Sequence, residues 1–360
     1  MSDQTFKTLH EFVKAAHLRL NQINWDYLIG GTETETTLRR NRHAIDTKAL
    51  LPRVLCDVTT VDPSTEILGQ SLSLPVVLAP IGSLQVFDPK GGAGAAVAAD
   101  QAGIMSIASS VCSPSLEEIA AASAAPKIYQ LYVRGDEVWV DDIVDRIIES
   151  GYLALCLTVD TAVLSRRERD IAKRVVPTSQ ASPGDFKFQA QLNWDEIARL
   201  KQKYDLPIIL KGINHPADAQ KALDLGVEVI YLSNHGGRQL DQGLGSLDLL
   251  EEIKAVIGNQ AELMIDGGFY RGTDIIKAIA LGADAVGLGR LQGWALAAGG
   301  PEALAQCLKI LRHEICETMA LCGVTTLKDL DPSFVRAAPA VAPPSVFSAF
   351  PLLDLADQGY

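Results

Sequence analysis

The 360-residue sequence is poor in aromatic residues (6%) and contains six cysteines, none of them in a C-x-x-C pair. Isolated cysteines in a chain of this length are typical of buried thiols in a reduced protein, rather than of a disulfide framework or a thiolate metal site. The six histidines are also scattered along the chain. We therefore expect no bound metal ion.

Long apolar runs and dense positive charge are also missing. No run approaches the roughly 20 apolar residues that a membrane span needs, and the start MSDQTFKTLH lacks the basic and apolar parts of a signal peptide. The net charge is −12, with 32 basic and 44 acidic residues and no Lys/Arg block, which argues against nucleic-acid binding. We expect a cytoplasmic protein that acts on a small molecule, with no membrane span and no nucleic-acid partner.

Apolar residues make up 48% of the chain, so a large core can form. The length allows either two ordinary domains or one large barrel with additions. From about residue 75, a short apolar run that ends in a polar residue or glycine recurs eight times, and a helix-like segment follows each run. The eight runs are Val76–Pro80, Met105–Ser109, Ile128–Tyr132, Ala154–Thr158, Ile208–Lys211, Val229–Ser233, Leu263–Asp266 and Ala285–Gly289.

Eight strands that alternate with helices predict a parallel α/β sheet closed into a (β/α)8 TIM barrel. A doubly wound sheet is the alternative, but it requires G-x-G-x-x-G after the first strand, where this chain has APIGSLQVF. We predict a single domain over 1–360: a helical, then extended N-terminal segment (1–74), the barrel (75–320) and a Pro-rich tail (321–360). A long excursion after the fourth strand (161–193) is expected to cover the site, and the apolar tail is expected to pack on this subunit or a neighbour.

In such a barrel the catalytic groups lie at the carboxyl ends of the strands. The polar side chains at or just after the eight runs are therefore expected to converge on one face. The segment SNHGGRQLD (233–241) stands out among them. Its histidine can act as a general base, its glycines allow close approach to a ligand, and its arginine can grip a carboxylate.

SNHGGRQLD is accompanied, in order along the chain, by WDYLIGG, LAP, SIASS, YQLYV, LTVDT with RRERD, ILKGI, DGG with RGTD, and ADAVGLGR. From about Phe12 to about Leu330 the chain thus resembles the FMN-dependent 2-hydroxy acid oxidases and dehydrogenases. The resemblance implies an FMN cofactor and oxidation of a small (S)-2-hydroxy acid to the 2-oxo acid. Reduced FMN would pass electrons to oxygen or another acceptor, and the protein would be a homo-oligomer, as a tetramer.

The resemblance also implies roles for individual residues. His235 would be the base, Asp160 would stabilise the imidazolium, and Lys211 would face the flavin edge where negative charge develops on reduction. The catalytic set is completed by Tyr132 and Arg238. The residues implied to contact the substrate are Tyr27, Val111, Tyr132, Arg167, His235 and Arg238.

The implied FMN contacts form three groups. One faces flavin N5, one binds the isoalloxazine edge, and one surrounds the phosphate, where barrel enzymes commonly bind such a group. In that order they are Pro80, Ile81 and Gly82; Ser109, Gln130, Thr158, Lys211 and Ser233; and Asp266, Gly267, Gly268, Arg271, Gly289 and Arg290.

Three of the departures from the family pattern bear directly on the cofactor, the substrate and the electron acceptor. Tyr270 stands where most members have an arginine beside the phosphate, which predicts weaker FMN binding. Val111 replaces a bulky residue of glycolate oxidase, which predicts a wider pocket for a larger or more apolar substrate. Gly82 replaces a common alanine, which predicts a slow oxidase, or a dehydrogenase that passes electrons to a quinone or another carrier.

Other functions remain open at this point. Lys211 could be the Schiff-base lysine of an aldolase-type barrel, and a non-redox isomerase or a ligand-binding protein that has lost catalysis would share the fold.

Arg166, Glu168 and Arg169, beside Arg167, are expected to form a run of charges exposed to solvent.

Overall fold

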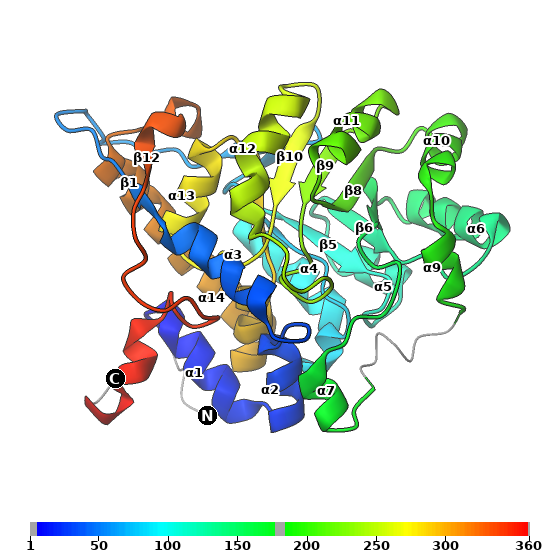
Figure 1. Cartoon of the computed structure of the whole chain (residues 1–360), viewed down its shortest axis with the longest axis horizontal. Helices are drawn as coiled ribbons and strands as arrows, with labels where there is room; N and C mark the ends of the chain where they lie inside the picture. Colours follow the sequence, from blue (N-terminus) through cyan, green and yellow to red (C-terminus); the bar gives the residue numbers. More distant parts are fainter. Residues whose placement is uncertain (1–5, 177–183, 359–360) are drawn as a thin grey trace.

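The structure, a computed structural model, describes residues 6–176 and 184–358. Eight parallel strands close into a barrel in the order β10-β11-β4-β5-β6-β7-β8-β9 (Figure 1), which confirms the predicted (β/α)8 TIM barrel. Each strand begins and ends within two residues of its predicted bounds. The strands are β4 (Val76–Leu78), β5 (Met105–Ser109), β6 (Lys127–Leu131), β7 (Ala154–Thr158), β8 (Ile208–Ile213), β9 (Val229–Leu232), β10 (Glu262–Ile265) and β11 (Ala285–Leu288).

Helices cover the outside of the barrel. They are α4 (Gly91–Ala102), α5 (Leu116–Ala121), α6 (Glu137–Glu149), α10 (Trp194–Lys203), α11 (Pro216–Asp224), α12 (Ser246–Ile257), α13 (Gly272–Ala280) and α14 (Arg290–Cys322), with a short 3-10 turn, η1 (Leu84–Val86), after β4. Ser115 and Glu118 form a capping box at the start of α5. Helix α14 is interrupted at Gly299 and Gly300, where the backbone leaves helical geometry just before Pro301.

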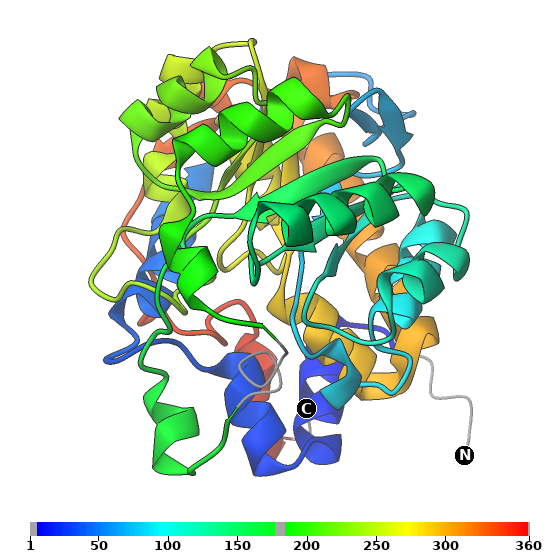
Figure 2. The same ribbon diagram turned by 90° about the vertical axis from the view of Figure 1, so that its right-hand side faces the viewer.

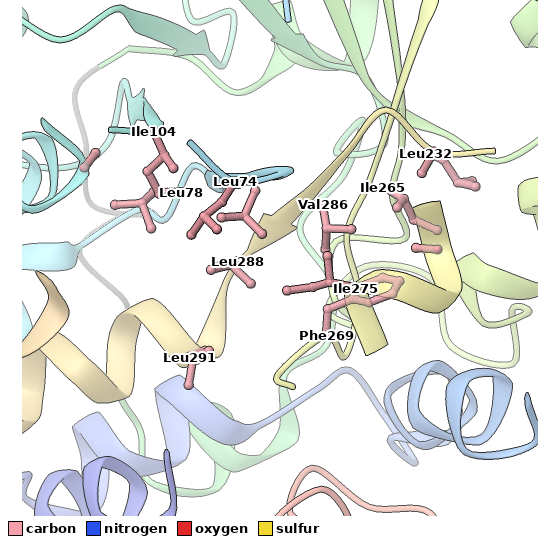
Figure 3. Packing of buried hydrophobic residues seen from close by; sticks show 14 of the residues in the cluster. Leu74, Leu78, Ile104, Leu232, Ile265, Phe269, Ile275, Val286, Leu288 and Leu291 are labelled. Atoms are coloured by element: carbon pink, nitrogen blue, oxygen red, sulfur yellow. The ribbon is translucent and has the colours of Figure 1, made fainter. Parts of the chain in front are cut away.

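The main core lies between the strands and this helical layer. Figure 3 shows Leu78, Val286 and Leu288 of the strands among side chains such as Ile275 of α13 and Leu291 of α14. All five side chains are at most 1% exposed. Burial of this extent fixes the strands against the helices, and so fixes where the strand ends point.

The N-terminal segment contains α1 (Leu9–Arg19), α2 (Gln22–Ile29), α3 (Thr36–Asp46), β1 (Lys48–Leu50), β2 (Thr65–Ile67) and β3 (Gln70–Leu72). The predicted helical stretch is broken between α1 and α2. Leu20 is extended, and the side chain of Asn21 accepts a hydrogen bond from the Asn24 amide at 2.9 Å, which starts a new helix. The break lets α2 turn toward the barrel mouth.

The β2–β3 hairpin closes the end of the barrel at which the strands begin. Ile67 and Leu72 of the hairpin pack on interior side chains such as Ile209 and Met264, and all four are at most 2% exposed. The Leu68 amide donates to both carboxylate oxygens of Glu262 at the start of β10, at 2.8 and 3.1 Å. The hairpin is therefore an apolar plug, held in place by a charged acceptor.

The excursion after β7 contains two short helices, α7 (Glu168–Ala172) and α9 (Lys187–Gln191); its residues 177–183 lie outside the described part of the chain. Figures 1 and 2 both show α7 beside α2. None of the helices in residues 6–176 and 184–358 is long and apolar enough to cross a membrane.

The tail contains η2 (Leu327–Asp329), η3 (Pro332–Phe334), β12 (Val335–Ala337) and η4 (Pro351–Gln358). As expected from its prolines, it holds no long α-helix. Strand β12 pairs antiparallel with β1. Phe350 is fully buried against the rings of Tyr270 and Trp294, each with its centroid 5.5 Å away. This part of the tail therefore packs on its own chain.

Candidate active site

A cavity of about 870 Å³, which includes space open to solvent, lies at the carboxyl ends of the strands. It collects side chains from the N-terminal segment, the excursion and most of the strand ends. Of the residues predicted from the sequence, those that line it are Tyr27, Pro80, Ile81, Gly82, Val111, Tyr132, Arg167, Lys211, His235, Arg238, Asp266, Gly267, Gly268, Gly289 and Arg290.

The turn after β9 has an unusual backbone. His235, Gly236 and Gly237 have φ values of 59°, 64° and 75°, so three successive residues are left-handed. This geometry costs a glycine little but strains a histidine. A Cβ on Gly237 would lie 2.5 Å from the Leu38 Cα, so this position also requires glycine for space. The Ser233 hydroxyl accepts from the His235 amide at 3.1 Å and holds the strained turn.

The His235 ring lies between an acid and a phenol. Its Nδ1 is 3.1 and 3.3 Å from the two oxygens of Asp160, and its Nε2 is 3.3 Å from the Tyr132 hydroxyl. Burial lowers the pKa of His235, and Asp160 only partly opposes this effect. Burial alone would raise the pKa of Asp160, but His235 and Lys211 outweigh it and the pKa is lowered. The pair therefore favours a neutral imidazole on an ionised carboxylate, with Nε2 free to accept a proton.

The Lys211 ammonium lies at the floor of the cavity. It donates to the Ser233 hydroxyl at 2.9 Å and lies 3.6 Å from an Asp266 oxygen. Burial would lower the pKa of Lys211, but Asp266 and Asp160 raise it above its ordinary value. The ion pair with Asp266 favours the ammonium form of Lys211, whereas a Schiff-base nucleophile requires the neutral amine. This observation argues against the aldolase alternative.

Guanidinium groups give the cavity an excess of positive charge. Arg238 donates to the carbonyls of Tyr27 and Gly30, at 2.7 and 2.9 Å, and Arg290 donates to those of Gly30 and Gly236, at 2.8 and 3.1 Å. Within the described residues, neither guanidinium lies within 4.0 Å of a carboxylate. Burial lowers the pKa of both, and the neighbouring Arg167 lowers that of Arg238 further. Buried cations whose partners are neutral carbonyls favour an anionic ligand.

Tyr27 reaches the cavity from α2. Its hydroxyl donates to the Gly82 carbonyl at 3.0 Å, and the Arg238 guanidinium lies 4.9 Å from the centre of its ring. The N-terminal segment and the residue expected to face flavin N5 are thus joined by one hydrogen bond.

Five predicted residues, apart from Arg271, are not among those that line the cavity: Ser109, Gln130, Thr158, Asp160 and Ser233. The Ser109 hydroxyl donates to Gln130 Oε1 at 2.8 Å. Gln130 Nε2 and Thr158 Oγ1 are buried without a hydrogen-bond partner in the described part of the chain. Such unpaired groups are costly unless a ligand satisfies them.

These groups fit FMN. The unpaired amide and hydroxyl suit the polar edge of an isoalloxazine ring, and Lys211 supplies a cation near it. Gly267, Gly268, Gly289 and Arg290 line the same cavity, where backbone amides and a guanidinium could hold a phosphate.

Arg271 is not brought to the cavity. Its guanidinium forms an ion pair with Glu314 at 2.5 Å and donates to the Ala349 carbonyl of the tail at 3.4 Å. Tyr270 lines the cavity in its place, with the Arg42 guanidinium 5.4 Å from its ring centre. The sequence motif located this turn, but it did not determine which of the two adjacent side chains faces inward.

Sequence analysis also missed part of the lining. Phe87, Phe269 and Gly287 contribute to the cavity. A Cβ on Gly287 would lie 1.9 Å from the Tyr231 hydroxyl, so only glycine fits there. Gly287 lies inside an apolar strand run rather than at its end, and this position gave no signal in the sequence.

Comparison with known proteins agrees with this geometry. The family model described as FMN-dependent dehydrogenase matches residues 16–185 and 177–337. An L-lactate oxidase of Nostoc sp. is 38% identical over 91% of this chain and 97% of its own length. Glycolate oxidase of Spinacia oleracea is 34% identical over 91% and 95%, respectively.

Solved structures give the same result. A crystal structure of mandelate oxidase with benzoyl-formic acid has a TM-score of 0.86 and 34% identity, and covers 94% of this chain and 100% of that one. The chain therefore belongs to the family of FMN-dependent 2-hydroxy acid oxidases and dehydrogenases, and is an oxidoreductase whose cofactor is FMN.

Proposed function

We propose that this protein oxidises an (S)-2-hydroxy acid to the 2-oxo acid, with His235 as the base. The observation that carries the proposal is the largely shielded His235–Asp160 pair, with side chains 16% and 11% exposed, in which Nδ1 faces the carboxylate and Nε2 lies on the side of Tyr132, which also lines the cavity. General bases of this kind contribute about 10²–10⁴ in rate. The guanidinium groups of Arg238 and Arg167, which both line the cavity, support an anionic substrate.

FMN, when bound, supplies the acceptor for the two electrons that leave the substrate. The side chains of the cavity bind the substrate and accept its proton. Arg238, Arg167 and Tyr27 hold the carboxylate, and the Tyr132 hydroxyl bonds the substrate's oxygen. His235 takes a proton at Nε2, and Asp160 stabilises the imidazolium that results. The ammonium of Lys211 stabilises negative charge that develops nearby.

We propose a substrate with a side chain larger or more apolar than that of glycolate. Val111 and Tyr132 line the cavity, and both also line a second cavity on their other side. Tyr129, Trp139 and Ile143 contribute to that second space. Related mandelate oxidase structures contain benzoyl-formic acid or (S)-2-phenylpropionate, which supports a substrate class with an aromatic or branched side chain.

We propose that the reduced cofactor reacts slowly with oxygen and passes its electrons to a quinone or another carrier. The absent methyl at Gly82, whose carbonyl is already bonded to Tyr27, supports different packing over the flavin. Rapid reoxidation of the reduced protein in air-saturated buffer, measured by stopped flow, would contradict this part of the proposal.

The function is tested by anaerobic titration of the purified holoenzyme with 2-hydroxy acids from glycolate to mandelate, followed by visible absorption. Bleaching of the oxidised flavin bands, with one 2-oxo acid formed per flavin, is the expected result. Flavin that no member of the panel reduces would overturn the proposal.

We further propose a cytoplasmic homotetramer. Analytical ultracentrifugation of the holoenzyme should give four times the 38.6 kDa mass of one chain, and a monomer would contradict the proposal. Cell fractionation should recover the protein with soluble cytoplasmic markers.

A further inference from the structure

The substrate end of the cavity is assembled from three separate parts of the chain. They are α2 with the loop after it, the segment that leads into α7, and the turn after β9. The Thr32 amide donates to the Gly237 carbonyl at 3.0 Å, and the Ser165 hydroxyl donates to the Arg238 carbonyl at 2.6 Å. The relative placement of these parts therefore decides where Tyr27, on α2, and Arg167, just before α7, meet the cavity.

Arg169 of α7 binds two carboxylates of the N-terminal segment. Its Nε and Nη2 donate to the two oxygens of Glu35 at 2.6 and 2.8 Å, and its Nη1 lies 3.2 Å from Asp26. Lys173, one turn further along the chain, forms a second ion pair with Asp26. We call Asp26, Glu35, Arg169 and Lys173 the α2–α7 ion-pair cluster. Its central contact is a bidentate fork, which has stricter geometry than a single-point ion pair.

The cluster is partly shielded from water. The side chain of Asp26 is 7% exposed and that of Glu35 is 18% exposed, whereas that of Arg169 is 40% exposed. Burial alone would raise the pKa of Glu35, but the hydrogen bond from Arg169 outweighs it and the pKa is lowered. The same hydrogen bond raises the pKa of Arg169. The fork also packs tightly, because a Cβ on Gly30 would lie 3.0 Å from the Arg169 side chain.

Arg166 and Glu168, next to Arg169 in the sequence, take no part in this cluster. Arg166 and Glu168 form a loose pair at 3.8 Å, with side chains 67% and 59% exposed. They match the solvated charge run expected from the sequence, and Arg169 does not. Arg166 is therefore a matched control three residues away, with the same charge and no part in the cluster.

We propose that Arg169 is a positioning residue that fixes α7 on α2, and thereby sets Arg167 and Tyr27 at the substrate end of the cavity. Arg169 does not line the cavity itself, so it acts through these two neighbours. The inference rests on the proposed function, because it assumes that Arg167 and Tyr27 bind the substrate carboxylate. Arg169 is not among the residues expected to hold FMN and does not line the cavity, so cofactor binding should be independent of it.

The test compares Arg169→Gln with Arg166→Gln in the FMN-loaded enzyme. Arg169→Gln should raise KM about tenfold and change kcat less than about twofold, with FMN content unchanged. Arg169→Lys should lie between the parent and Arg169→Gln, because an ammonium cannot form the fork. Arg166→Gln should match the parent. An unchanged KM in Arg169→Gln, or an equal rise in Arg166→Gln, would overturn the proposal.

Two further measurements keep the proposal falsifiable. In a double-mutant cycle, Glu35→Gln should add little to Arg169→Gln, because both remove the same fork. Amide hydrogen exchange of residues 165–173 should be faster in Arg169→Gln than in Arg166→Gln, and equal exchange would contradict the proposal. The exchange measurement needs no substrate, so it still decides the positioning question if no 2-hydroxy acid reduces the parent's flavin, which would be a failure of the proposed function alone.

Discussion

The two ends of the barrel are built from opposite kinds of residue. Where the strands begin, the β2–β3 hairpin inserts Ile67 and Leu72 among fully buried apolar side chains. Where the strands end, Gln130 and Thr158 keep polar atoms without a partner among the described residues, and His235 is held at a φ of 59°. Apolar burial at one end stabilises the fold, while the other end retains strain and polar groups that a ligand can satisfy.

The largest expected effect at the ligand-binding end comes from replacing Asp160, the carboxylate that contacts the proposed base His235. Asp160→Asn keeps the shape of the side chain, but it no longer offers an anion to the Nδ1 of His235 at 3.1 Å. The rate of flavin reduction should fall by about a hundredfold or more, measured by anaerobic stopped flow. The FMN content and melting temperature should stay close to those of the parent. A rate within a few-fold of the parent would show that Asp160 only holds the turn.

A substitution in the β2–β3 hairpin should lower the stability of the protein but leave the rate of flavin reduction unchanged. Ile67→Ala removes a fully buried side chain and should lower the free energy of unfolding by about 2–4 kcal/mol, measured by urea denaturation of the holoenzyme. Flavin reduction below the transition should stay at the parent rate. Ile148→Ala is the control, since that side chain is 45% exposed and should change stability by less than about 0.5 kcal/mol. Slower flavin reduction in Ile67→Ala would contradict the claim that this end of the barrel affects stability but not catalysis.

Another pair of variants tests whether Arg290 or Arg271 binds the phosphate of FMN. If Arg290 binds the FMN phosphate as expected, Arg290→Gln should weaken FMN binding roughly tenfold, because a charge-assisted contact is removed. Arg271→Gln should leave FMN affinity unchanged, because its guanidinium is paired with Glu314 outside the cavity. Fluorescence titration of the apoprotein measures both. An equal loss of FMN affinity in the two variants would mean that Arg271 also binds the phosphate.

The smallest expected effect is a shift in pH dependence. Burial lowers the pKa of His235 below its ordinary 6.5, so its neutral, basic form persists to lower pH. A plot of kcat/KM against pH should therefore be flat near neutrality and fall on the acid side, with an apparent pKa below 6.5. An acid limb centred above 6.5 would mean that Asp160 outweighs burial and that the resting histidine is protonated.

The barrel itself could be predicted because its signals are local. Each strand is an apolar run that ends in a polar residue, so all eight were located within two residues. The break between α1 and α2 was missed because it depends on one cap at Asn21, within a stretch that is otherwise helical in pattern. Spacing shows which face of an element is buried, but not where a helix is interrupted.

Much of the candidate site could be predicted because strand ends converge in a barrel. His235 and Lys211 are far apart in the chain but both line the cavity, and Asp160 lies against the Nδ1 of His235. Arg169 was misjudged because its partner Glu35 is 134 residues away, and no local pattern reports such a pairing. Arg271 differs for a related reason: adjacent residues in a turn point in different directions, and the motif does not say which one faces inward.

The most direct test of the account is the reductive half-reaction of His235→Ala, loaded with FMN and mixed anaerobically with the best substrate of the parent. We expect a protein that stays yellow and binds FMN normally, because no predicted flavin contact is removed. Its flavin should be reduced about 10⁴-fold more slowly than in the parent. Reduction at the parent rate would contradict the assignment of His235 as the base.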